Sequence, residues 1–187
     1  MRVIGGDLKR SKLFGPEDGD DSIRVTYDRV RESIFNLTGP MDGARFLDLF
    51  AGAGSVGIEA LSRGAAKVTF VDHAPKAIRL VESNVGKFGL EDRVEIIRMD
   101  FREYVAGGAA RGVFDLIFLD PPYAGSLFEA AMDSPGIADM LADGGKVVGQ
   151  HGAEPERAKF GALIMADVRR YGSSWVSIWK KNKDSEK

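Results

Sequence analysis

The feature that most constrains the fold is a regular alternation of short apolar segments with helical segments. Apolar, β-rich runs occur at residues 44–50, 67–71, 94–98, 113–119 and 146–149. Most of the segments between them have helical character. Strands and helices that alternate at this spacing predict βαβ units. The fold class we expect is therefore α/β, a Rossmann-like sandwich built on a mostly parallel, doubly wound sheet.

The two ends of the chain depart from this alternation. Residues 163–170 and 174–180 flank Tyr171-Gly172-Ser173, a pattern that predicts an antiparallel C-terminal hairpin. At the other end, residues 2–4 and 12–14 are expected to form a small N-terminal β-hairpin.

Two further helices have recognisable ends. Pro75 suits the first turn of a helix and Gly89 its end, which predicts a helix over residues 75–88. Thr26 is expected to cap a helix that runs to about Leu37.

Length and composition fit one domain with a full core. The chain has 187 residues, of which 44% are hydrophobic and 29% charged. We expect an extension, residues 1–40, packed on a core domain of residues 41–187 as a single structural unit. No apolar run approaches the roughly 20 residues of a membrane helix, and the N-terminus has no signal-peptide pattern. The chain has no cysteine and two distant histidines. We therefore expect a cytoplasmic protein with no membrane association and no metal.

A glycine-rich turn joins the first predicted strand to its helix. The segment DLFAGAGSVG contains Gly52, Gly54 and Gly57 in the pattern GxGxxG, and Asp72 ends the next strand 20 residues after Gly52. Such glycines let the backbone approach a nucleotide closely, and an acid at this spacing accepts hydrogen bonds from ribose hydroxyls. The pattern alone fits a nicotinamide dinucleotide and S-adenosylmethionine (SAM) equally well.

Asp48, directly before the glycines, favours SAM. A carboxylate at this place repels a pyrophosphate, whereas it attracts the ammonium and sulfonium groups of SAM. At the end of the third strand, Asp100 can accept a bond from the adenine amino group and Phe101 can cover the ring, although a plain helix cap at Asp100 is an alternative. The candidate cofactor-binding residues are Asp48, Ala51, Gly52, Gly54, Asp72, His73, Asp100 and Phe101.

The second chemical motif is Asp120-Pro121-Pro122-Tyr123, directly after the fourth predicted strand. It is expected at the carboxyl edge of the sheet, where ligands bind in open α/β folds. The Pro121 carbonyl and the Asp120 carboxylate are two acceptors, and Tyr123 offers a stacking surface. These groups suit a planar base with an exocyclic amine, whose nitrogen they would direct toward a methyl donor. Asp120, Pro121 and Tyr123 are therefore candidate catalytic residues; a proline-rich turn with Asp120 as a helix cap is the alternative.

Basic side chains gather in a few places although the net charge is −2. They lie at residues 9–12, 24–31 and 169–183. Solvated surface is the simplest interpretation of each cluster, but together they fit one face directed at phosphates. The candidate RNA-binding residues are Lys9, Arg10, Lys12, Arg24 and Arg29.

With these motifs the sequence resembles the RsmD-like family, bacterial SAM-dependent enzymes that methylate a guanine N2 in small-subunit (16S) ribosomal RNA. The resemblance covers nearly the whole chain, and its most specific parts are RVIGG at residues 2–6 and RVTYDRVRESIFN at residues 24–36. It implies a seven-stranded methyltransferase fold with an antiparallel last hairpin. It also implies that Asp120 and Tyr123 hold the target guanine and that the N-terminal extension meets the RNA, naked or in an assembling 30S particle. We expect a monomer.

Two segments depart from the family pattern, and three alternatives stay open. Gln150-His151 stands where a glutamate is common, and an acidic loop at residues 17–21 interrupts the basic arm. A DNA or RNA adenine-N6 methyltransferase shares the Asp-Pro-Pro-Tyr motif, although the chain leaves no room for an obvious target-recognition domain. A nicotinamide oxidoreductase is disfavoured by Asp48. A non-catalytic RNA-binding protein with a SAM pocket is the third alternative.

Overall fold

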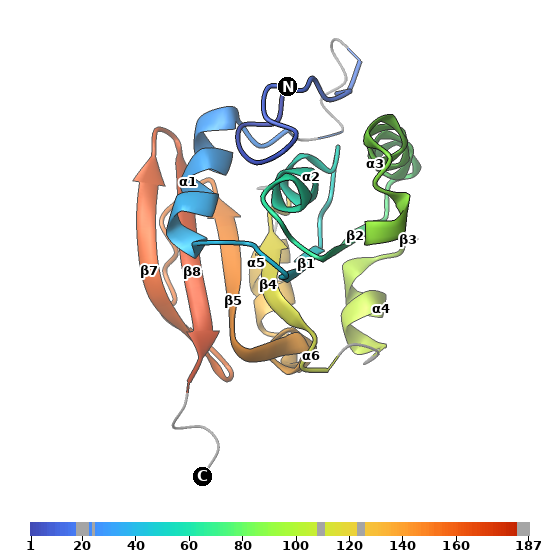
Figure 1. Ribbon diagram of the computed structural model, residues 1–187. Coiled ribbons are helices and arrows are strands. Elements are labelled where there is room, and N and C mark those ends of the chain that lie inside the picture. Colours follow the sequence, from blue (N-terminus) through green and yellow to red (C-terminus); the bar gives the residue numbers. More distant parts are fainter. Residues whose placement is uncertain (18–22, 24, 108–110, 123–125, 183–187) are drawn as a thin grey trace.

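The described residues of the computed structural model are 1–17, 23, 25–107, 111–122 and 126–182. They form an eight-stranded sheet with the strand order β3-β2-β1-β4-β5-β8-β7-β6 (Figure 1). The strands are β1 (Arg45–Asp48), β2 (Lys67–Asp72), β3 (Val94–Arg98), β4 (Phe114–Leu119), β5 (Leu141–His151), β6 (Lys159–Phe160), β7 (Leu163–Tyr171) and β8 (Ser174–Lys181).

The direction of the strands divides the sheet into two parts. Strands β1 to β5 pair in parallel, with β2 and β4 on either side of β1. Strand β8 is antiparallel to β5, and β7 is antiparallel to β8. The strand order reverses between β1 and β4. From β1 the chain adds β2 and β3 on one side, and it then returns to the other side of β1 to add β4 and β5. The carboxyl ends of strands at such a reversal are where open α/β sheets bind ligands.

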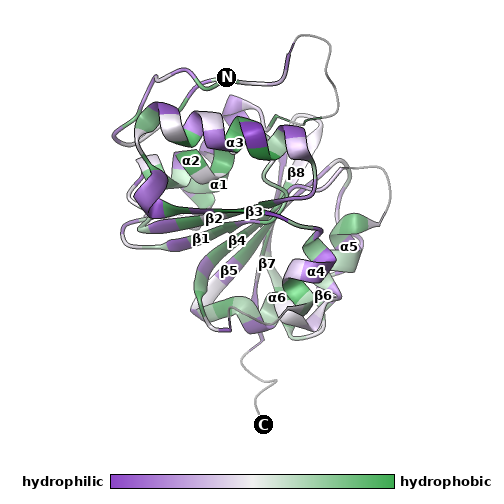
Figure 2. Ribbon diagram, turned by 90° about the vertical axis from the view of Figure 1, so that its right-hand side faces the viewer, coloured by the Kyte–Doolittle hydropathy of each residue, from purple (hydrophilic) through white to green (hydrophobic). Residues whose placement is uncertain are grey.

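Helices cover both faces of the sheet. They are α1 (Asp28–Thr38), α2 (Ser55–Ser62), α3 (Pro75–Phe88), α4 (Phe101–Ala106), α5 (Leu127–Met132) and α6 (Pro135–Met140), with a short 3-10 helix, η1 (Glu91–Arg93). Figure 2 shows α1, α2 and α3 on one side of the sheet and α4, α5 and α6 on the other. Within the described ranges, no helix has both the length and the apolar character needed to cross a membrane.

The strand periodicity of two explains why there is a core on each face. In β1, Phe46 joins the cluster beneath α1, α2 and α3, while its neighbour Leu47 joins the cluster beneath α4, α5 and α6. In β4, Phe118 and Ile117 divide in the same way, and all four side chains are fully or almost fully buried. Successive side chains of a strand point to opposite faces, so a strand covered on both sides is apolar throughout.

This architecture confirms the expected fold class, with one difference in strand number. The sequence predicted seven strands, and the eighth is β6, which contributes only Lys159–Phe160 and pairs with the start of β7. Two residues are too few to show an alternation in the sequence. The helix predicted over residues 75–88 and the hairpin around Tyr171-Gly172-Ser173 are both present.

The N-terminal expectations need two corrections. The expected hairpin is reduced to a single antiparallel bridge between Arg2 and Lys12. Helix α1 begins at Asp28 with Tyr27 as its N-cap and no side-chain cap, so the prediction that Thr26 caps this helix is wrong. The Thr26 hydroxyl instead donates a hydrogen bond across the fold to Asp120, at 3.1 Å.

The backbone of the first residues of the chain is hydrogen-bonded to side chains of helix α2. The fully buried carboxylate of Glu59 accepts from the N–H groups of Ile4 and Gly5, both at 2.7 Å. Ser62 donates to the Gly5 carbonyl at 2.6 Å and accepts from the Leu8 N–H at 2.9 Å. The N-terminal segment therefore packs directly on the core, while the division of the chain at residue 40 stays a prediction.

Candidate functional site

The glycine-rich turn after β1 has the backbone conformation that its sequence requires. Gly52 and Gly54 have φ values of 53° and 75°, in the left-handed region that favours glycine. Gly54 is the N-cap of α2. Gly57 packs so closely on β2 that an added Cβ would lie 2.2 Å from the ring of Phe70. The first two glycines shape the turn, and the third lets the helix approach the sheet.

Asp72 ties the turn to the end of β2. One carboxylate oxygen accepts from the Gly52 N–H and the other from the Ala74 N–H, each at 2.9 Å. Each oxygen keeps acceptor capacity beyond this bond, because a carboxylate has about four lone-pair positions. Asp72 therefore holds the turn in place and can also accept bonds from hydroxyl groups of a ligand. His73, next in the chain, is exposed, and its Nδ1 atom lies 3.6 Å from Asp72.

A cavity of about 80 Å³ lies between this turn, the end of β2 and the end of β4. The predicted site residues that line it are Asp48, Ala51, Gly52, Asp72, His73 and Asp120. Phe50 and Thr26 line it as well, although neither was predicted from the sequence as a site residue. Phe50 was detectable as an aromatic residue between Asp48 and the glycines, whereas no local signal links Thr26 to the cavity.

Asp48 is a buried acid of the cavity whose pKa is shifted far from its ordinary value. It is 1% exposed; its Oδ2 atom accepts from the Gly57 N–H at 3.2 Å, and its Oδ1 atom is buried with no hydrogen-bond partner among the described residues. Burial raises the pKa of Asp48 to about 8; the Gly57 bond opposes this shift, and the charges of Asp120 and Asp72 add to it. The cavity by itself thus favours the protonated form of Asp48, and a bound cation would favour its carboxylate instead.

Three predicted cofactor residues do not line the cavity. Gly54 is the N-cap of α2, next in the chain to Ser55, which does line the cavity. Asp100 is the N-cap of α4, where its side chain accepts from the Arg102 N–H at 2.8 Å, as the alternative interpretation had it. Phe101 is buried and packs on Phe50, with ring centroids 5.1 Å apart. Direct contact of these three residues with a cofactor stays a prediction.

The Asp-Pro-Pro-Tyr motif follows β4 at the carboxyl edge of the sheet, as expected. Asp120 is 8% exposed and lines the cavity. Pro122 lines the same cavity and also a second, larger hollow of about 690 Å³, which Pro121 borders too. The motif therefore stands between two hollows. Tyr123 lies outside the described residues, so its predicted stacking role is not tested.

Comparison with known proteins places this arrangement in a family. A family model described as Conserved hypothetical protein 95 matches residues 1–180. "Putative rRNA methyltransferase YlbH" of Bacillus subtilis is 41% identical over 97% of this chain and 99% of its own length. Ribosomal RNA small subunit methyltransferase D of Haemophilus influenzae is 34% identical over 71% of this chain and 68% of its own length. The chain belongs to the RsmD-like family.

A solved structure of the same kind supports the assignment of the fold. The "Putative methyltransferase yhhF" of Escherichia coli is 26% identical and superposes with a TM-score of 0.79 over 97% of this chain and 98% of that one. This RsmD-like chain therefore has the Rossmann-like methyltransferase fold.

The second hollow of this RsmD-like chain contains the segment that departs from the family pattern. Phe128, Gln150 and His151 line it. The His151 ring packs on Phe128 with centroids 4.1 Å apart, and its Nε2 atom lies 2.6 Å from the Ser177 hydroxyl. Ser177 also accepts from the Trp179 indole N–H at 2.7 Å. His151 is thereby fixed as part of the wall.

The buried position of His151 predicts a pH-dependent contribution to stability. Burial lowers the pKa of His151 to about 4 from its ordinary 6.5. The unfolded chain binds a proton below about pH 6.5 that the folded chain does not bind until about pH 4. We therefore expect a His151→Gln variant to gain stability relative to the unmodified chain as pH falls from 6.5 to 4, by up to about 1.4 kcal/mol per pH unit. Urea unfolding of both proteins at several pH values measures it, and a constant difference contradicts it.

The predicted RNA-binding residues of the extension partly converge. A surface hollow is lined by Arg2, Lys9, Arg10 and Arg29, together with the acids Asp28 and Glu32. We call this hollow, with its four cationic side chains, the basic hollow. Lys12 is not among its lining residues, and Arg24 lies outside the described part of the chain. Arg10 has a φ of 73°, a conformation that a residue other than glycine adopts only when its surroundings hold it.

Proposed function

We propose that this chain is a SAM-dependent methyltransferase that transfers a methyl group to the N2 amine of a guanine in small-subunit ribosomal RNA. The observation that carries the proposal is the position of Asp120-Pro121-Pro122 between a cavity lined by three acids and a larger hollow. We further propose that the protein acts as a cytoplasmic monomer, on free RNA or on an assembling 30S particle. The names of its relatives support ribosomal RNA as the substrate.

The donor set of the cavity fits SAM better than a dinucleotide. Three carboxylates, those of Asp48, Asp72 and Asp120, border the same small cavity. The Oδ1 atom of Asp48 is a buried acceptor with no described partner, which suits the ammonium group of SAM. Asp72 is placed for hydroxyl groups, and the half-buried ring of Phe50 offers an apolar surface. A pyrophosphate, unlike a cation, would oppose ionisation of the acids of this cavity.

In the proposed reaction, this chain's residues bind and orient the amine. SAM supplies a methyl group that is activated by its positively charged sulfur. The Asp120 carboxylate and the Pro121 carbonyl each accept a hydrogen bond from one N–H group of the amine. This arrangement directs the nitrogen lone pair toward the cavity. Such positioning is worth up to about 7–11 kcal/mol for well-aligned reactants. As the new C–N bond forms and the C–S bond breaks, the nitrogen becomes cationic, and it then loses one proton to Asp120 or to water.

The second hollow supports guanine rather than adenine as the base. Glu129, Gln150 and Glu154 line it, and all carry side-chain oxygens that accept hydrogen bonds. Guanine presents an N1–H donor beside its amine, whereas adenine presents an unprotonated N1 acceptor there. A carboxylate stabilises the first edge and repels the second. Tyr123, outside the described residues, remains the predicted stacking partner of the base.

The proposal is tested by product analysis. The protein is incubated with methyl-labelled SAM and, separately, with small-subunit RNA, partly assembled 30S particles and duplex DNA, and each sample is digested to nucleosides. We expect label in N2-methylguanosine from the RNA or the particle. Label in N6-methyladenine identifies the adenine methyltransferase instead. Tight SAM binding without label in any sample favours the non-catalytic RNA-binding protein.

The basic hollow predicts a salt effect on RNA binding. We expect Lys9→Ala/Arg29→Ala to weaken binding of small-subunit RNA and to lower the slope of log K against log salt by about 1.4, roughly 0.7 for each lost single-strand phosphate contact. An Arg98→Ala/Arg111→Ala control removes the same charge from exposed positions outside the hollow. Filter binding between 50 and about 300 mM salt measures both slopes. Equal slopes for the two double variants contradict an RNA contact at the hollow.

A further inference from the structure

A buried hydrogen bond links the N-terminal extension to the proposed catalytic carboxylate. The Thr26 hydroxyl donates to Oδ2 of Asp120 at 3.1 Å, across 94 positions of sequence. Thr26 is 5% exposed and Asp120 is 8% exposed, so bulk water does not compete strongly for this bond. Thr26 lies just before α1 and lines the same cavity as Asp48. The bond limits rotation of the carboxylate, because one of its oxygens has a fixed partner.

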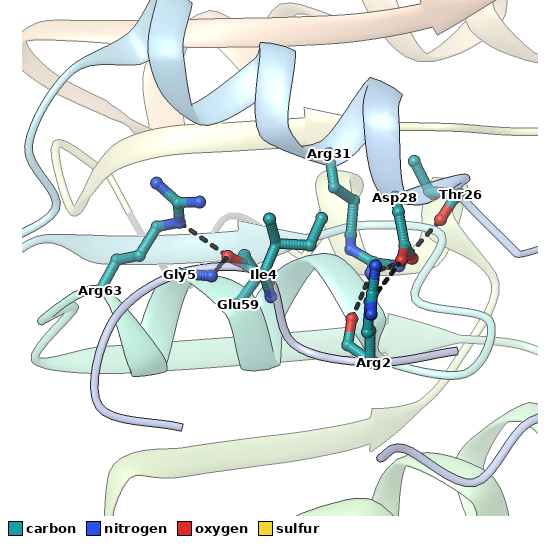
Figure 3. Close-up of polar contacts among 8 residues, drawn as sticks. All are labelled: Arg2, Ile4, Gly5, Thr26, Asp28, Arg31, Glu59 and Arg63. Carbon is teal, nitrogen blue, oxygen red and sulfur yellow. Dashed lines mark hydrogen bonds and ion pairs between the residues drawn. The ribbon is translucent and has the colours of Figure 1, made fainter. Parts of the chain in front are cut away.

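Thr26 is itself held by the buried side chain of Arg31. The Arg31 guanidinium is fully buried, and its Nη1 atom donates to the Thr26 carbonyl at 2.8 Å. Its Nη2 atom donates to the Arg2 carbonyl at 2.5 Å and to Oδ1 of Asp28 at 2.8 Å. Figure 3 shows this guanidinium between the first residues of the chain and the start of α1. A planar guanidinium holds several acceptors in a fixed arrangement, which an ammonium group does not.

The far end of this connection is fixed on α2. Beyond Arg2, the N–H groups of Ile4 and Gly5 are held by Glu59, which also accepts from Arg63 at 2.8 Å (Figure 3). The segment that contributes Arg2 to the basic hollow is thus connected through Arg31 and Thr26 to Asp120.

We propose that Thr26 is a positioning residue for Asp120, anchored through Arg31 to the N-terminal segment, so that the extension proposed to meet RNA also sets the orientation of the catalytic carboxylate. This inference rests on the proposed function. It assigns Thr26 no contact with the reacting atoms: its hydroxyl holds Asp120, and Asp120 holds the amine. The effect of losing the hydroxyl must therefore depend on the presence of the Asp120 carboxylate.

The first test separates turnover from binding. We expect Thr26→Val, which keeps the shape and removes the hydroxyl, to lower kcat for methyl transfer to small-subunit RNA by about tenfold or more. The Kd for SAM and the KM for RNA should stay within about threefold. Thr26→Ser, which restores a hydroxyl, should recover most of the lost kcat. The matched control is Thr38→Val, which removes another buried hydroxyl, at the other end of α1 and not among the residues that line the cavity.

The second test asks whether Thr26 acts through Asp120. In an Asp120→Ala background, Thr26→Val should change kcat by less than about twofold, because the carboxylate to be positioned is absent. Equal losses in the two backgrounds overturn the inference and assign Thr26 a separate role. Unchanged kcat in Thr26→Val, or a loss that Thr38→Val matches, overturns it as well.

Failure of the inference is distinguishable from failure of the proposed function. If the unmodified protein labels no RNA, the proposed function fails. If the unmodified protein is active and Asp120→Ala is equally active, the assignment of Asp120 fails. If the unmodified protein is active and depends on Asp120, the Thr26 variants test the positioning role alone.

Discussion

Asp120→Ala is expected to lower kcat for methyl transfer by about a hundredfold or more, a barrier increase of about 2.7 kcal/mol, while the Kd for SAM changes only a few-fold. The physical reason lies in the two roles proposed for the carboxylate. It accepts a hydrogen bond from one N–H group of the target amine, which directs the nitrogen lone pair. It also accepts a proton from the nitrogen after the methyl group has been transferred. Neither role is a contact with the cofactor, whose ammonium group we assign to Asp48 and whose hydroxyl groups we assign to Asp72. Single-turnover methylation of small-subunit RNA measures the rate, and calorimetric titration measures the affinity for SAM.

Two control variants make this expectation specific. Asp120→Asn keeps the shape and one acceptor oxygen but loses the charge, so its kcat should lie between those of the unmodified protein and Asp120→Ala. Asp139→Ala removes an exposed carboxylate that pairs with Arg111 at 3.8 Å. Asp139 lines neither the acidic cavity nor the second hollow, so this variant should leave kcat unchanged. A normal rate in Asp120→Ala removes Asp120 from the mechanism.

Much of the fold was predictable because its elements carry strong local signals. The helix Pro75–Phe88 and the strand Val94–Arg98 have the bounds that the sequence indicated. Proline at a first turn, glycine after a last turn and short β-rich runs all act within a few residues. The glycine-rich turn was predictable for the same reason, since Gly52 and Gly54 adopt a conformation that disfavours other residues.

The parts that the sequence did not predict depend on contacts between distant segments. Threonine is a residue type that commonly caps helices, but the Thr26 hydroxyl donates a hydrogen bond to Asp120, 94 positions away. Glu59 pairs with Arg63 four positions along the same helix, which the spacing allows, but the hydrogen bonds that Glu59 accepts from the Ile4 and Gly5 N–H groups have no sequence signal. Helices α5 and α6 have six residues each, too few to establish a helical period.

Asp48→Asn is expected to bind SAM at least about 30-fold more weakly, a loss of about 2 kcal/mol or more. The Asp48 carboxylate is buried, and its Oδ1 atom has no described partner, so a bound ammonium is the group that its charge would stabilise. An amide has the same shape but no charge. Because the pKa of Asp48 is raised to about 8, binding a cation at pH 7 should release a proton. Calorimetry in two buffers of different ionisation enthalpy detects this release in the unmodified protein and its absence in the variant.

The same substitution is expected to stabilise the protein without cofactor. The unfolded carboxyl titrates near pH 3.9 and the folded one near pH 8, so between these values the folded chain holds a proton that the unfolded chain has lost. The free energy of unfolding therefore falls as pH rises through this interval, by up to about 1.4 kcal/mol per unit, and Asp48→Asn lacks this loss. At pH 7 we expect its Tm to be at least about 3 °C higher.

An exposed acid provides the control for both effects. Asp92→Asn, on η1, removes one negative charge at the surface and should change neither the affinity for SAM nor the pH dependence of stability. Weaker SAM binding by Asp48→Asn together with a lower Tm would indicate general damage to the cavity rather than loss of a charge. Weaker SAM binding together with a higher Tm is the outcome that we expect. It would mean that the buried Asp48 destabilises the folded chain without cofactor, and that its charge serves to bind the cation of the cofactor.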